Sequence, residues 1–195
     1  MQEKKYKEAA SFYEPIVHKN FDSGILNTSA MILANLVVCY IMTNQNEDAE
    51  ELLRKVEREE AVALEERPNE KHFHNSIISL VIGSLYCSKG NYEFGITRVI
   101  KALEPPEKKL SVDTWYYAKR CIVATIETIA RNTLVMRDSV INELIEFLTK
   151  CEGPGRNIYT VPEDLFDVSA ESKVKCNVTY EARMLKAALL TVFHS

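Results

Sequence analysis

The feature that most constrains the fold is a run of small and aromatic residues between positions 82 and 105. Its marked positions are Gly83, Tyr86, Gly90, Tyr92, Gly95, Ala102 and Pro105. Small residues such as Gly83 and Gly95 let two antiparallel helices approach closely, and larger residues such as Tyr86 fill the groove between them. The run therefore predicts two helices that pack tightly and are joined by a turn at Gly90.

This spacing is that of the tetratricopeptide repeat, a helix pair of about 34 residues. One such pair cannot bury its apolar faces alone, so pairs stack into a solenoid whose inner surface can hold another chain. The composition fits a mostly helical chain, with 46% hydrophobic and 27% charged residues and only six glycines and six prolines. We predict an all-α tetratricopeptide-repeat superhelical solenoid with a C-terminal capping helix, which is a binding scaffold and not an enzyme.

Helical periodicity divides the chain into six segments. They are the second helix of a truncated repeat (1–19), two tetratricopeptide repeats (24–66 and 69–107), a degenerate repeat (111–152), an extended segment (153–177) and a capping helix (178–195). The later part should hold helices over 112–131, 138–148 and 179–193. Because the first segment lacks the helix that should cover it, we interpret the chain as a fragment that several repeats precede.

The first complete repeat is longer than the standard. Tyr40 and Tyr86 occupy equivalent positions but lie 46 residues apart, against about 34 in the standard repeat. The extra residues fall within 57–71, which is rich in Glu and Arg. Since Glu, Arg, Ala and Leu favour helix, the sequence predicts an over-long second helix with a solvated charged face.

Several classes of protein are excluded by composition and motif. A net charge of −4 argues against a nucleic-acid-binding surface. The longest apolar run, 32–42, is too short to span a bilayer, so no membrane insertion is expected. Five cysteines at irregular spacing indicate neither disulfides nor zinc, and favour a reducing intracellular compartment. No catalytic motif, metal-ligand spacing or cofactor loop is present, so no cofactor or metal is expected.

The first helix of each pair should supply the inner surface. The predicted partner-binding residues are Met31, Ala34, Asn35, Val38 and Ile41 in the first repeat, Ile77, Leu80 and Ser84 in the second, and Tyr116 and Arg120 in the third. Ala34 and Val38 occupy the positions where chaperone-binding repeats carry lysine and asparagine, so that function is rejected.

Most of these residues are apolar, and an apolar wall of this kind must be covered in water. One interpretation is that a bound apolar or proline-containing segment covers it, with Asn35 bonding to the segment's backbone. The alternative is a structural spacer, in which neighbouring turns of the superhelix cover the wall and partners bind the outer surface.

Five stretches of the chain resemble one protein family closely. They are residues 34–52, 89–96, 113–121, 137–141 and 180–187. All are similar to the C-terminal part of the tetratricopeptide repeat protein 30 family, also called the Fleer family. Members of this family are the tetratricopeptide subunit of the intraflagellar-transport B complex. The resemblance covers nearly the whole chain and is weakest over 157–175.

The resemblance implies a location in the cilium, including its base, and a compact superhelix that wraps a proline-rich, apolar segment of a fellow subunit. It implies roles in anterograde transport, cilium assembly and axonemal tubulin polyglutamylation, without the chain performing that modification. Protein subunits of the intraflagellar-transport B complex are the expected partners, with a kinesin motor or cargo as further candidates.

Overall fold

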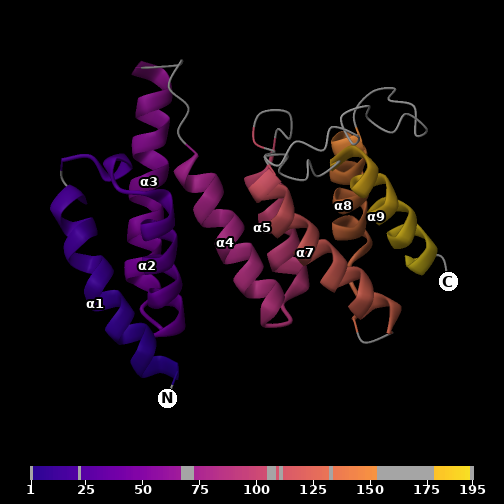
Figure 1. Cartoon of the computed structure of the whole chain (residues 1–195), viewed down its shortest axis with the longest axis horizontal. Coiled ribbons are helices and arrows are strands. Elements are labelled where there is room, and N and C mark those ends of the chain that lie inside the picture. The colour runs from indigo at the N-terminus through magenta and orange to yellow at the C-terminus, as the bar shows by residue number, and fades with distance from the viewer. Residues whose placement is uncertain are drawn as a thin grey trace, which may run out of the picture. The chain divides into compact units, whose positions relative to one another are not determined.

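The computed structural model describes residues 2–21, 23–66, 73–104, 109, 112–131, 134–152 and 178–193. Within these ranges every regular element is helical (Figure 1). The chain divides into two compact units, residues 1–85 and 86–195, and the division falls inside helix α4 (His74–Ser88). The expected all-α tetratricopeptide-type fold is confirmed, and the extended segment expected over 153–177 lies outside the described residues.

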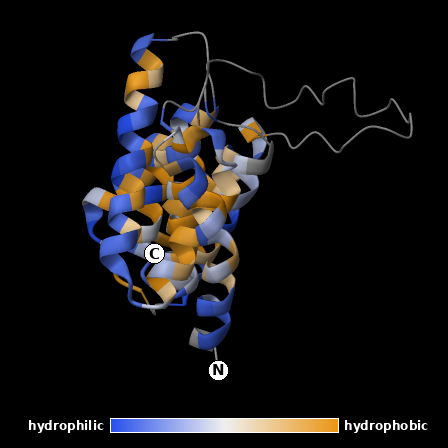
Figure 2. Ribbon diagram, turned by 90° about the vertical axis from the view of Figure 1, so that its left-hand side faces the viewer, coloured by the Kyte–Doolittle hydropathy of each residue, from blue (hydrophilic) through white to orange (hydrophobic). Residues whose placement is uncertain are grey.

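The first unit is built around α2 (Ala30–Met42), which packs against both α1 (Gln2–Phe21) and α3 (Asn46–Glu66). A short 3-10 helix, η1 (Ile25–Asn27), contacts α1 and α3. Since α2 is apolar along nearly all its length, it can be buried from two sides. Its fully buried residues include Leu33, Ala34 and Val37. Hydrophobic residues accordingly concentrate where the helices face each other, and hydrophilic residues lie outside (Figure 2).

The turns of the two complete helix pairs have the same geometry. The Gln45 amide donates to the Tyr40 carbonyl at 2.9 Å, and the Asn91 amide donates to the Tyr86 carbonyl at 2.9 Å. This bond is the one that closes a helix when the residue after the cap adopts a left-handed backbone. That residue is Asn44 in the first turn, with φ 60°, and Gly90 in the second, with φ 85°. The turn predicted at Gly90 is confirmed, and so is the equivalence of Tyr40 and Tyr86.

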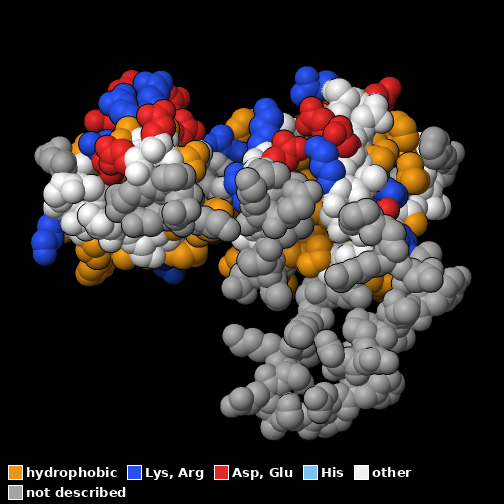
Figure 3. All heavy atoms as spheres, turned by 90° about the horizontal axis from the view of Figure 1, so that it is seen from above, with side chains coloured by type: hydrophobic (Ala, Val, Ile, Leu, Met, Phe, Trp, Pro, Cys, Tyr) orange, Lys and Arg blue, Asp and Glu red, His pale blue; other side chains and the backbone are white. Residues whose placement is uncertain are grey.

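Helix α3 is the over-long second helix that the sequence predicted. It has 21 residues, whereas α5 (Tyr92–Ala102), at the same place in the next pair, has 11. Side chains of both signs crowd the outside of the unit that contains α3 (Figure 3).

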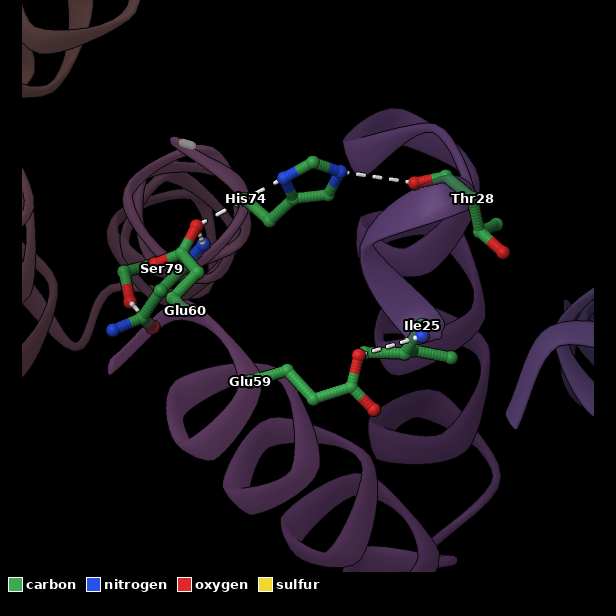
Figure 4. Close-up of polar contacts among 7 residues, drawn as sticks. Ile25, Thr28, Glu59, Glu60, His74 and Ser79 are labelled. Atoms are coloured by element: carbon green, nitrogen blue, oxygen red, sulfur yellow. Dashed lines mark hydrogen bonds and ion pairs between the residues drawn. The ribbon is translucent and has the colours of Figure 1, made fainter. Parts of the chain in front are cut away.

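The prediction of a fully solvated charged face on α3 is wrong for two glutamates. Glu59 accepts a hydrogen bond from the Ile25 amide at 2.8 Å, and Glu60 accepts one from the Asn75 amide at 3.1 Å. His74 Nε2 lies 3.0 Å from the Thr28 carbonyl oxygen, so the start of α4 is tied to the segment after η1 (Figure 4). Because the amides near a helix or loop start lack backbone partners, these carboxylates fix the extra turns of α3 in place.

The second unit contains α5, α7 (Val112–Ala130), α8 (Asp138–Glu152) and α9 (Val178–Phe193). Helix α5 packs on α7 and α8, and α9 packs on the same two helices. The largest fully buried side chains of this unit are Ile96, Leu103, Trp115, Ile122, Leu144, Phe147, Leu148 and Leu189. Helices expected over 112–131 and 179–193 are present, and α8 continues four residues beyond the expected end at 148. No described helix has the length and apolar character needed to cross a membrane.

Candidate partner-binding surface

The accessible face of α2 is a stripe that begins at Met31. Met31 is 47% exposed, and Asn35, Val38 and Met42 are half-buried. These four residues follow each other at spacings of four, three and four, which places them on one side of a helix. Ile41 is half-buried at the edge of this stripe, whereas Ala34 is fully buried. We call Met31, Asn35, Val38 and Met42 the α2 stripe.

The structure changes the assignment of two α2 residues. Ala34 packs into the core, because α2 is covered by a helix on each side. Met42 belongs to the accessible face and was missed by sequence reasoning, although its spacing from Val38 could have indicated it. The side-chain amide of Asn35 donates a weak hydrogen bond to the Tyr13 hydroxyl of α1, with the two atoms 3.4 Å apart.

On α4 the three predicted residues differ in accessibility. Ile77 and Ser84 are half-buried, whereas Leu80 is buried. The Ser84 hydroxyl donates to the Leu80 carbonyl at 2.9 Å within the helix. Ile77 and Ser84 thus offer limited surface to a partner, and Leu80 offers almost none.

On α7 the predicted residues form an exposed platform. Tyr116 is 52% exposed, and the Arg120 guanidinium lies 5.7 Å from the centre of its ring. Tyr117, which was not among the predicted residues, is 41% exposed and meets Tyr116 edge to face, with the ring centres 5.8 Å apart. A guanidinium over an aromatic face stabilises the pair and holds the ring at the surface. We call Tyr116, Tyr117 and Arg120 the α7 platform.

The α2 stripe and the α7 platform lie in different units. Met31, Asn35, Val38 and Ile41 come together on one helix of the first unit, and Tyr116 and Arg120 come together on one helix of the second. The predicted site therefore consists of local patches, and their use by one partner stays a prediction. In the parts of the chain that the structure describes, no three His, Cys, Asp or Glu residues gather as metal ligands would.

Comparison with known proteins identifies the family. The family model described as Intraflagellar transport protein 70 C-terminal domain matches residues 1–195. The chain belongs to this family. It is 77% identical over 194 residues to Tetratricopeptide repeat protein 30 homolog of Caenorhabditis elegans, covering 100% of the chain and 30% of that protein. It is 55% identical over 192 residues to Intraflagellar transport protein 70B of Homo sapiens, covering 98% of the chain and 29% of that protein.

Family membership confirms the resemblance that the five sequence stretches carry. The names of the relatives describe intraflagellar transport and tetratricopeptide-repeat proteins. The chain spans about 30% of the length of the relatives named here.

Proposed function

We propose that the chain is part of a non-enzymatic scaffold subunit of the intraflagellar-transport B complex, acting in the cilium and at its base. In this proposal it wraps an apolar, proline-rich segment of a fellow subunit. Through that contact it supports anterograde ciliary transport, cilium assembly and axonemal tubulin polyglutamylation. Kinesin motor and cargo are further partners in the proposal.

The observation that carries the proposal is the set of apolar and aromatic side chains left accessible on first helices. The α2 stripe exposes Met31 beside half-buried Val38, and the α7 platform exposes Tyr116. Aromatic rings and flexible methionines are the side chains that protein interfaces favour. Burial of apolar area contributes about 25 cal/mol per Å², so two or three such anchors supply several kcal/mol before ordering costs.

One observation favours the second candidate function, a structural spacer whose partners bind the outer surface. Ala34 and Leu80, two of the ten predicted contact residues, are already buried within the chain. To that extent the chain covers its own inner wall, as the spacer requires. The accessible residues Met31 and Tyr116 remain the part of the wall that can distinguish the two candidates.

Substitution of Met31 tests the proposal against a matched control. Met31 on α2 and Val62 on α3 are both 47% exposed, so Met31→Asp and Val62→Asp place one charge at equally accessible sites. Each variant is co-expressed with one intraflagellar-transport B subunit at a time, and recovery of the complex is measured together with the helical circular dichroism. We expect Met31→Asp to weaken binding of the proline-rich subunit about tenfold or more, because an apolar anchor becomes charged.

The outcome for the control decides between the candidates. The wrapping proposal requires that Val62→Asp leaves binding unchanged and that Tyr116→Ala lowers it. The spacer is supported instead if Met31→Asp and Tyr116→Ala both retain the complex while Val62→Asp loses it. Unchanged circular dichroism in each variant excludes loss of fold as the cause.

A further inference from the structure

A small pocket lies where α1, α2 and α3 meet, and none of its lining residues belongs to the α2 stripe. It has a volume of about 130 Å³ and is lined by Val17, His18, Phe21, Leu36, Tyr40, Asp48, Glu51 and Leu52. Pockets for drug-sized ligands are typically about 300–1,000 Å³. The size of this pocket therefore fits a single side chain better than a cofactor or metabolite.

The walls of the pocket are apolar and its charged groups are acidic. Val17, Leu36 and Leu52 are buried residues of three different helices. Asp48 and Glu51 supply two carboxylates, and the structure shows no described lysine or arginine within ion-pair distance of either. The nearest described polar partner of Asp48 is the side-chain amide of Gln45, at 3.2 Å. Both residues are exposed, and among the described residues neither carboxylate pairs with a lysine or arginine.

The buried Tyr40 lines the pocket and interacts electrostatically with two carboxylates. Burial, followed by the carboxylates of Glu14 and Asp48, raises the pKa of the Tyr40 hydroxyl to about 12. Two carboxylates of α3, Asp48 and Glu51, line the pocket at its exposed side, and a positive charge inserted beside them would be favoured.

The rim continues into a second, wider groove. Phe21 and Glu51 line both the pocket and this groove, whose other residues are Glu47, Glu50, Arg54, Lys55 and Arg58. The Lys55 ammonium lies 5.3 Å from the centre of the Phe21 ring, so the ring already accepts a cation on one face. The groove gives an extended chain room to lie across the mouth of the pocket.

We propose that this pocket binds a lysine or arginine side chain from a basic segment of a partner protein. The aliphatic stem lies against Val17, Leu36 and Leu52, and the cationic head meets Asp48 and Glu51. Lysine and arginine each carry a positive charge at the end of an apolar stem. The pocket offers the matching combination, an apolar wall next to carboxylates. The proposal goes beyond wrapping of an apolar segment, because it adds a second partner contact of opposite chemical character.

The test uses small probes and the methyl groups of the pocket itself. N-acetyl-arginine methylamide, N-acetyl-lysine methylamide and the neutral N-acetyl-norleucine methylamide are titrated into the 195-residue chain. Methyl resonances of Val17, Leu36 and Leu52 are followed by NMR. We expect saturable shifts with one or both cationic probes and none with norleucine, because the apolar stem alone lacks the attraction of the carboxylates.

Matched variants assign the binding to the pocket. Glu51→Gln removes a pocket carboxylate, whereas Glu57→Gln removes an exposed carboxylate of the same helix that lines neither the pocket nor the groove. Glu51→Gln should weaken the cationic probe about threefold to tenfold, and Glu57→Gln should leave it unchanged. Absence of shifts with both cationic probes, equal shifts with norleucine, or equal loss in the two variants would each overturn the proposal. Binding of the apolar partner at Met31 is measured separately and is independent of these outcomes.

Discussion

At the scale of single residues, one carboxylate joins two distant parts of the second unit. Glu181 of α9 accepts a hydrogen bond from the Trp115 ring nitrogen at 2.6 Å and from the Lys119 ammonium at 2.9 Å. Trp115 is fully buried, so its N–H needs a partner inside the protein. Hydrogen bonds to a charged group contribute about 1.5–3 kcal/mol, more than those between neutral groups.

We predict that Glu181→Gln lowers the free energy of unfolding of the second unit by about 1–2 kcal/mol, because the neutral amide loses the charge-assisted bonds. Urea unfolding followed by tryptophan fluorescence measures this directly, since Trp115 is the only tryptophan in the chain. Glu127→Gln is the control: its exposed carboxylate lies 3.8 Å from Arg131 and should contribute little. Equal losses in the two variants would contradict the role given to Glu181.

This contact also shows what local sequence could not predict. Trp115 and Glu181 are separated by 66 positions, and no periodic pattern specifies which carboxylate a buried indole will meet. The turn at Gly90 could be predicted, because a left-handed backbone favours glycine whatever surrounds it. Residue roles fixed by the local backbone were therefore predictable, and those fixed by long-range packing were not.

At the scale of elements, α9 closes the second unit by packing on α7 and α8. Leu189 is fully buried in this contact, and the Lys186 ammonium pairs with Glu152 of α8 at 2.7 Å. We predict that Leu189→Ala costs about 2–5 kcal/mol, because it leaves a cavity under α9. Hydrogen exchange measured by mass spectrometry should then rise in α9 and in the facing parts of α7 and α8.

The control for this prediction lies on the same helix. Met184 of α9 is exposed, so Met184→Ala removes a similar volume without opening a cavity. It should leave exchange in α7 and α8 unchanged. If Leu189→Ala has no more effect than Met184→Ala, α9 does not stabilise the unit by packing.

Helix positions were predictable from sequence, but the buried face of each helix was only partly so. Periodicity indicated α7, and good helix formers indicated the length of α3. On α2 almost every residue is apolar, so the pattern could not decide which face its neighbours cover. Ala34 was therefore assigned to the accessible face although it is buried, and Met42 was missed.

At the scale of the whole molecule, stacked helix pairs contact mainly their nearest neighbours. The two units of this chain each have their own core, represented by Leu33 in the first and Leu148 in the second. In such a chain, a destabilised unit can unfold before the other, because few interactions couple distant pairs. The only tryptophan lies in the second unit, so its fluorescence reports that unit, whereas circular dichroism reports both.

We predict that Leu33→Ala and Leu148→Ala separate these two signals. Both leucines are fully buried, so each truncation should cost about 2–5 kcal/mol in its own unit. Leu148→Ala should lower the urea midpoint of the Trp115 fluorescence. Leu33→Ala should lower the midpoint of the circular dichroism while the fluorescence midpoint moves much less. Equal movement of both signals in Leu33→Ala would show one cooperative transition, with α4 transmitting the loss of the first core to the second.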